Sequence, residues 1–220
     1  MAEILLESFP VKLTLEHVLD KLSVTDDEGV GLATELYNEA MSRANPKIYF
    51  RDLHVDRIEG GEAVINGVSF KSKVLADNLE GVEVVIAYVM TCGVEVDEWS
   101  HTRTDSIEAF WLDIIKEQIL YAASVHFHQV LRDTYGLDKT SSVSPGSGNV
   151  DAWPIAQQRD FFRMMGSVRE KTGVVLTDSY LMLPTKSVSG VIFQSDRQFV
   201  NCILCSRENC QNRRAQYKPV

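Results

Sequence analysis

The longest regular pattern in this chain is an apolar helical stripe over residues 106–133. Apolar residues recur there at a spacing of 3.6, beginning with Ile107, Phe110, Trp111, Ile114 and Ile115 and continuing through Ile119, Phe127 and Leu131. At 1.5 Å per residue, a helix of about 28 residues is roughly 40 Å long, enough to cross a small domain. The stripe therefore predicts a central helix that needs a broad surface to pack on.

Extended patterns lie on both sides of this helix. Residues 82–91 are almost continuously apolar and β-branched, which is typical of a strand covered on both faces. The stretch that begins at Gly173 predicts two strands around Pro184 and Thr185. We therefore expect an α+β fold, a single domain over residues 1–220 with helices packed on an antiparallel or mixed sheet. Within it, the Phe110, Trp111, Ile114 and Ile115 stripe should pack on a sheet that contains residues 82–91 and 174–183.

Composition narrows the class of protein. Of the 220 residues, 45% are hydrophobic and 24% are charged, which predicts a globular core. The net charge of −9 argues against nucleic acid as the main partner, because phosphate binding needs a basic face. No run approaches the ~20 apolar residues of a membrane span, and the first ten residues, MAEILLESFP, do not resemble a signal peptide. We therefore expect a cytoplasmic protein.

The segment TSSVSPGSGNVDAWP, from Thr140 to Pro154, does not suit a helix or a strand. Gly146 and Gly148 can adopt positive φ, and Pro145 removes a backbone donor. The segment is either a solvated connection or a shaped loop whose backbone N–H groups face an anionic ligand. Composition alone favours the solvated connection.

A second candidate for a ligand-binding segment, after the loop, is LTDSYLMLPTKSVSG, residues 176–190. Polar side chains alternate there with apolar ones, at Thr177, Asp178, Ser179, Lys186, Ser187 and Ser189. Such a strand can line a polar pocket, or it can be half-buried with a wet outer face. The pattern alone favours the second interpretation.

The third candidate is a cysteine-rich C-terminal tail, residues 200–220. Cys202, Cys205 and Cys210 have the spacing C-x2-C-x4-C, and Cys92 is the remaining cysteine. We expect the sulfurs of Cys202, Cys205 and Cys210 to face a common point, where they can hold one metal. Tetrahedral zinc and iron–sulfur clusters both need four ligands, and Cys92 could supply the fourth. The alternative is a set of reduced surface thiols.

The motif over residues 172–190 carries a family resemblance. It resembles the signature strand pair of the activation domain of cobalamin-dependent methionine synthase, T-G-x-x-L-T-[DE]-S-[YF]-x-M-x-P-x-x-S-V-S-G. The matching residues are Thr172, Gly173, Leu176, Thr177, Asp178, Ser179, Tyr180, Met182, Pro184, Ser187, Val188, Ser189 and Gly190. The resemblance covers residues 91–200 well, and we expect a freestanding version of that domain.

The resemblance implies an accessory reactivation protein for a corrinoid-dependent methyltransferase, with methionine synthase as the most direct partner. Such a domain binds S-adenosylmethionine and presents its methyl group to the partner's cobalamin, while a flavodoxin-like or ferredoxin-like donor supplies an electron. Positioning is its contribution, so no catalytic acid or base is expected. The alternative from another class is a metal- or iron–sulfur-binding scaffold or electron-transfer partner of a corrinoid protein, without S-adenosylmethionine.

The resemblance also implies a set of ligand-binding residues in the loop and the two strands. The loop would contribute Ser142, Pro145, Gly146, Ser147, Gly148 and Asn149, and the strands Asp178, Ser179, Tyr180, Lys186, Ser187, Ser189 and Gly190. Phe199 either stacks on the adenine or is a core residue. Ser142 stands where the family pattern has an arginine, and a serine cannot replace a bidentate contact to a carboxylate.

Overall fold

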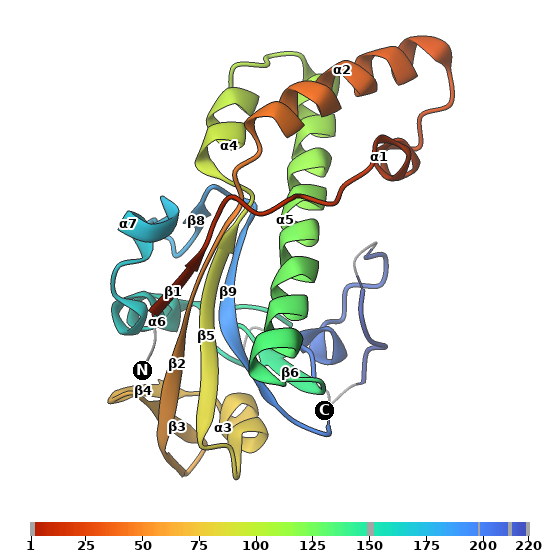
Figure 1. Ribbon diagram of the computed structural model, residues 1–220. Helices are drawn as coiled ribbons and strands as arrows, with labels where there is room; N and C mark the ends of the chain where they lie inside the picture. The colour runs from red at the N-terminus through yellow and green to blue at the C-terminus, as the bar shows by residue number, and fades with distance from the viewer. Residues whose placement is uncertain (1–2, 149–151, 198, 211–212, 219–220) are drawn as a thin grey trace.

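A seven-stranded antiparallel sheet forms the centre of the molecule in the computed structural model, which describes residues 3–148, 152–197, 199–210 and 213–218 (Figure 1). The strands of this sheet are β1 (Glu3–Leu6), β2 (Lys47–Glu59), β3 (Glu62–Ile65), β4 (Val68–Lys71), β5 (Val84–Thr91), β6 (Thr140–Val143) and β9 (Ser187–Gln194). Their order is β4-β3-β2-β5-β9-β6, with β1 paired to β2. The central place of β5 explains its apolar sequence, since helices cover both faces of the sheet.

Helices pack on both faces of the sheet and on one another. They are α1 (Leu15–Leu22), α2 (Asp27–Arg43), α3 (Lys73–Leu79), α4 (Val94–Ser100), α5 (Ser106–Tyr135), α6 (Gln158–Met165) and α7 (Val168–Thr172), with short 3-10 helices η1 (Ile155–Gln157) and η2 (Asn201–Leu204). The long helix α5 crosses one face, and α6 and α7 lie on the other (Figure 1). The expected α+β class, with helices packed on an antiparallel sheet, is confirmed.

The helix α5 begins and ends where its sequence signals it. The Asp105 side chain accepts hydrogen bonds from the N–H groups of Ile107 and Glu108, at 2.8 and 3.1 Å. Gly136 ends the helix in the left-handed conformation, at φ 66°. Among the described residues, no helix is both long enough and apolar enough to cross a membrane.

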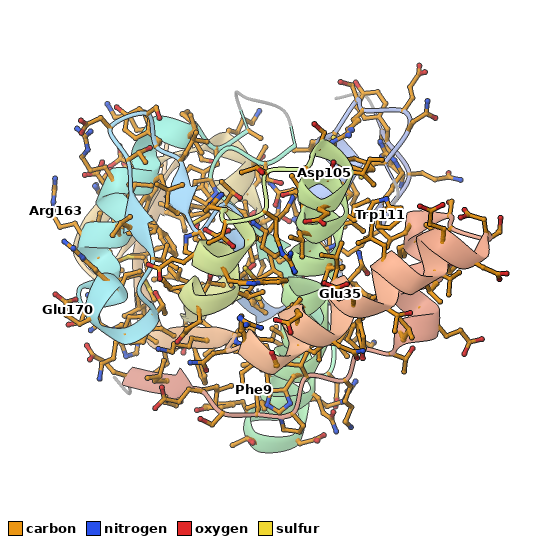
Figure 2. All side chains as sticks on the ribbon, turned by 90° about the horizontal axis from the view of Figure 1, so that it is seen from above. Phe9, Glu35, Asp105, Trp111, Arg163 and Glu170 are labelled. Atoms are coloured by element: carbon orange, nitrogen blue, oxygen red, sulfur yellow. The ribbon has the colours of Figure 1, made fainter. Side chains whose placement is uncertain are left out.

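The predicted packing face of α5 is wrong in its first half. Of the four predicted residues, Ile115 is buried, Trp111 and Ile114 are partly buried, and Phe110 is 64% exposed; Leu112 and Ile119 are the other buried apolar residues of this half. The buried residues of this half contact α1, α2 and α4, whereas the second half of α5 reaches the sheet through Leu120, Ala123, Phe127 and Leu131. Apolar residues lie on two sides of this helix, so periodicity could not tell which side has a partner. In the view from above, Trp111 lies on the side of α5 nearest α2, away from Arg163 and Glu170 (Figure 2).

A buried ion pair joins α4 to this part of α5. The Lys116 ammonium donates to an Asp97 carboxylate oxygen at 2.7 Å and to the Ser100 hydroxyl at 2.8 Å. Lys116 is only 4% exposed, so these partners are needed to hold its charge inside the protein. The interaction joins the first half of α5 to α4.

The expectation that residues 174–183 join the main sheet is also wrong. β7 (Val175–Leu176) and β8 (Met182–Leu183) form a separate two-stranded hairpin. The turn between them is closed by Thr177, whose N–H donates to the Leu181 carbonyl at 2.8 Å and whose hydroxyl accepts from the Leu181 N–H at 3.0 Å. The polar residues of the motif therefore form a tight turn, and only β9 enters the sheet.

Candidate functional site

A cleft of about 400 Å³ opens between the loop after β6, the β7–β8 turn, β9 and the C-terminal tail. Its volume is in the range of small-molecule sites, which is ~300–1,000 Å³. The lining residues include six of those predicted, namely Pro145, Gly146, Ser147, Tyr180, Ser187 and Ser189. Two segments far apart in the sequence therefore meet at one cavity.

The loop has a fixed shape in its described part. Gly146, at φ 71°, donates its N–H to the Trp153 carbonyl at 2.7 Å, and a Cβ there would collide with the Ile155 side chain. Gly148, at φ 84°, lies against the Asn201 carbonyl, 2.9 Å from where its Cβ would be. Both positions therefore require glycine. The loop is not the slack connection that its composition favoured.

Two predicted glycines frame the cleft without lining it. Gly148 contacts the tail, and Gly190 lies beneath the point where β6 passes into the loop. A Cβ on Gly190 would be 2.6 Å from the Val143 carbonyl oxygen. Because Gly190 has no side chain, the loop can turn closely over β9.

Other predicted residues lie outside the cleft. Asp178 and Ser179 are exposed in the β7–β8 turn, and the Ser179 hydroxyl lies 3.0 Å from that of Thr177. The Lys186 ammonium pairs with the Asp113 carboxylate of α5 at 2.8 Å. Phe199 is partly buried and packs on the core beneath the sheet.

The other two predicted loop positions are Ser142 and Asn149. Ser142 lines a second cavity of about 280 Å³ between α5, β9 and the tail. Asn149 lies outside the described residues.

Gln158, on α6, presents a buried amide to the cleft. It is 1% exposed, and its Nε2 donates to the Ser189 hydroxyl at 2.7 Å. Its Oε1 has no hydrogen-bond partner among the described residues. A buried acceptor without a partner is costly, so this oxygen is suited to accept a hydrogen bond from a ligand.

Two tyrosines line the cleft in different settings. Tyr88, on β5, is buried, and burial raises the pKa of its hydroxyl, an effect partly offset by a hydrogen bond with Ser144 and by the charge of Arg214. Tyr88 therefore carries a neutral hydroxyl. Tyr180 has a φ of 65°, unusual for an aromatic residue, and the Arg159 guanidinium lies 5.2 Å from its ring centroid.

The tail forms a wall of the cleft, and the convergence predicted for its cysteines is wrong. Among the described residues, which include all four cysteines, no group of three or more His, Cys, Asp or Glu side chains could hold a metal ion. Cys92 is fully buried in an apolar cluster, where burial raises its pKa to about 12, so its thiol stays protonated and is a poor ligand.

An arginine and an asparagine organise the tail. The Arg213 guanidinium donates to the carbonyls of Cys202, Cys205 and Ala215 at 3.1–3.2 Å, and also to that of Arg207. Buried Asn201 accepts from the Ser144 N–H at 3.1 Å and donates to the Ser147 carbonyl at 2.8 Å. The tail is thereby joined to the loop.

Sequence reasoning missed several residues of the cleft, namely Tyr88, Gln158, Asn201 and Arg214. Tyr88 looked like one more apolar residue of a buried strand, and Gln158 like an ordinary polar position on a helix. No local pattern marks either. Asn201 and Arg214 belong to the tail, where the cysteines suggested a different chemistry.

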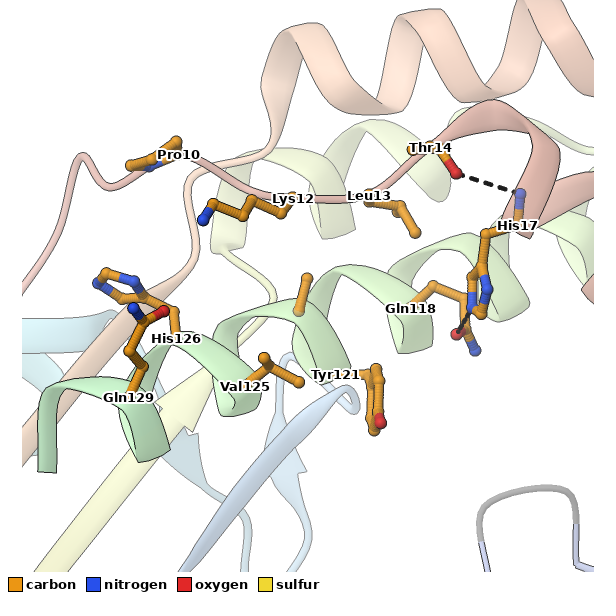
Figure 3. A pocket seen from close by; sticks show the side chains of 11 residues that line it. Pro10, Lys12, Leu13, Thr14, His17, Gln118, Tyr121, Val125, His126 and Gln129 are labelled. Carbon is orange, nitrogen blue, oxygen red and sulfur yellow. Dashed lines mark hydrogen bonds between the residues drawn. The ribbon is translucent and has the colours of Figure 1, made fainter. Parts of the chain in front are cut away.

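A further groove of about 290 Å³ lies between the N-terminal segment and α5 (Figure 3). Lys12 and Leu13 line one side, and Tyr121 and Val125 the other. The His17 Nε2 lies 3.0 Å from the Gln118 Oε1 at one end. None of the residues predicted for ligand binding lines this groove, so it is separate from the cleft.

Comparisons with known proteins agree with the motif. Residues 67–216 match the family described as "Vitamin B12 dependent methionine synthase, activation domain". Because the match spans more than half of the chain, the protein belongs to this family. It is similar in fold to the crystal structure of the MetH reactivation domain bound to AdoHcy, with 16% sequence identity, a TM-score of 0.60, and coverage of 88% of this chain and 78% of that chain. A search of curated proteins found no match.

Proposed function

We propose that this domain binds S-adenosylmethionine in the cleft and presents its methyl group to the cobalamin of a corrinoid-dependent methyltransferase, with methionine synthase as the direct candidate. The observation that carries the proposal is the meeting of motif residues Tyr180, Ser187 and Ser189 with the Pro145–Gly146–Ser147 loop at one cavity. Family membership, and the AdoHcy in the structure of similar fold, support it.

The residues of the cleft fit such a ligand. The unpartnered Gln158 Oε1 can accept a hydrogen bond from an amino group of the ligand. The Tyr180 ring, held by Arg159, offers a flat surface for the adenine, and stacking of a base on an aromatic ring contributes ~1–3 kcal/mol. The hydroxyls of Ser187 and Ser189 add polar contacts along β9.

The protein contributes positioning. The ligand supplies the methyl group, and the partner carries the cobalamin. A flavodoxin-like or ferredoxin-like protein would supply the electron, in the cytoplasm. Tyr88 keeps its proton because burial raises its pKa, so it orients the ligand and does not act as a base. Holding the donor in a rigid cleft is itself a large effect in group transfer.

Calorimetric titration of the purified domain with S-adenosylmethionine tests the binding step. Tyr180→Asn removes the ring, while asparagine tolerates the positive φ, so we expect about tenfold weaker binding. Asp178→Asn is the matched control, because Asp178 lies in the same turn but outside the cleft. Absence of heat at millimolar ligand, with and without a corrinoid methyltransferase, would refute the proposal. Formation of methylcobalamin, followed by its absorption spectrum with a reductant present, tests the transfer step.

A further inference from the structure

Arg214 is the one charged residue among the described residues that line the cleft. It also lines the second cavity, together with Tyr88 and Val188, so it stands where the two cavities adjoin. Its charge reaches the Tyr88 hydroxyl, whose pKa it lowers against the larger effect of burial. A cation at this point acts on any ligand that occupies the cleft.

The tail places Arg214 through bonds made by its neighbours. Arg213 is held by carbonyl groups of η2 and of the segment after it, and the Lys218 N–H donates to the Ile203 carbonyl at 2.8 Å. Asn201 joins η2 to the ligand loop. Residue 214 is therefore fixed between two anchored points, with its side chain bordering the cavity.

The guanidinium of Arg214 makes no hydrogen bond or ion pair with another described residue. Within the cleft, the described lining residues include no carboxylate, and the acidic residue nearby, Glu117, lines the second cavity. In a chain of net charge −9, a cation free of such partners at a cavity is suited to an anion. The planar guanidinium fits a carboxylate with two parallel hydrogen bonds.

We propose that Arg214 binds the carboxylate of the ligand in this cleft and thereby selects adenosyl compounds with an intact amino-acid group. The inference rests on the proposed function. S-adenosylmethionine also carries a sulfonium, and an arginine beside it would be repelled; the α-ammonium is on the same carbon as the carboxylate, so the carboxylate is the group of the ligand that can attract the guanidinium. The carboxylate end of the ligand therefore points to the tail, and the methyl-bearing sulfonium is held away from Arg214.

The test compares two ligands and two variants by calorimetry. Arg214→Gln keeps the length and polarity of the side chain but removes its charge. We expect it to bind S-adenosylmethionine about ten- to a hundredfold more weakly, the usual range for a hydrogen bond to a charged group. Decarboxylated S-adenosylmethionine should bind the native protein and Arg214→Gln within about twofold of each other. Arg207→Gln, in the same tail but lining neither cavity, should bind both ligands as the native protein does.

Each outcome decides a separate question. Unchanged binding of S-adenosylmethionine by Arg214→Gln overturns the inference and leaves the proposed function standing. Equal weakening of both ligands also overturns it, because the arginine then acts on the cleft and not on the carboxylate. If the native protein binds neither ligand, the proposed function fails and the inference fails with it. Arg214→Lys keeps the charge but lacks the planar guanidinium, so it should bind S-adenosylmethionine with an affinity between those of the native protein and Arg214→Gln. It is the test variant if Arg214→Gln does not fold.

Discussion

The loop after β6 and the C-terminal tail both form walls of the cleft, but they are held in place by different means. The loop is shaped by glycines at positive φ and by close backbone contacts, at Gly146 and Gly148. The tail is held by side chains that donate to carbonyl groups, chiefly those of Arg213 and Asn201. A backbone constraint is local and rigid, whereas a side-chain bond can be lost without disturbing the core. We therefore expect substitutions of the glycines that shape the loop to lower global stability, and substitutions in the tail to loosen only the tail and the contacts it makes.

Gly190→Ala should lower the unfolding free energy most, because it adds a side chain at the base of the loop. The new Cβ would be 2.6 Å from the Val143 carbonyl oxygen and 2.5 Å from the Ser144 hydroxyl, so β6 or the loop must move. Overpacking of this kind costs about 3 kcal/mol of unfolding free energy, measured by urea denaturation. Gly31→Ala in α2 is the control, since a Cβ there meets nothing within 4 Å and should stabilise by about 0.5–1 kcal/mol. Equal stability of the two variants would contradict a tight contact at Gly190.

Asn201→Ala tests the joint between the two walls. The substitution removes the bonds to Ser144 and Ser147 and leaves the Ser144 N–H unpaired, so the free energy of local opening at the loop should fall by about 2 kcal/mol. Amide hydrogen exchange should then accelerate at Ser144 more than in β5. Asn209 is exposed in the same tail, so Asn209→Ala should leave amide exchange at Ser144 and in β5 unchanged. If exchange at Ser144 stays slow, the loop holds its shape without the tail.

The same contrast explains how far the sequence could predict the site. Gly146, Pro145 and the motif serines have local meanings in turns and strands, but those meanings favoured a solvated connection and a half-buried strand. Only the family resemblance assigned the loop and the motif to one ligand. Arg214 and Asn201 have no such local meaning, because the partner of a long side chain is set by tertiary structure. The three tail cysteines had a local pattern that suggested metal, but the fold directs Arg213 to the carbonyls around them.

The sequence predicted the fold about as completely as it predicted the site. The length of α5 and the apolar run of β5 follow from periodicity and composition. The face of α5 that is buried does not, because Phe110 and Leu112 are both apolar and only the position of α2 and α4 decides between them. The turn at Thr177–Leu181 was missed because alternating polar residues resemble a strand until a hydroxyl closes a turn.

Arg213→Met should release the tail while leaving the core intact. The carbonyls of Cys202 and Cys205 lose their donor but can turn to water, so the global unfolding free energy should fall by less than about 1 kcal/mol. Limited proteolysis should cut the tail several-fold faster than in the native protein. Arg207→Met is the control, because the Arg207 side chain makes no hydrogen bond or ion pair with another described residue. A large drop in the urea midpoint would show that the tail belongs to the cooperative core.

Arg159→Leu should change stability and ligand affinity least among these variants, and it tests the wall of the cleft formed by the β7–β8 turn. The guanidinium lies 5.2 Å from the Tyr180 ring centroid, a cation–π contact worth ~0.5–1 kcal/mol at an exposed site. Its loss leaves Tyr180 free to change rotamer, so we expect two- to fivefold weaker binding of S-adenosylmethionine, by calorimetry, at nearly unchanged stability. Arg163→Leu is the matched control on α6, since Arg163 pairs with Asp160 and lies away from the cleft. If Arg159→Leu lowers stability without weakening binding, the contact supports the β7–β8 turn and not the ligand.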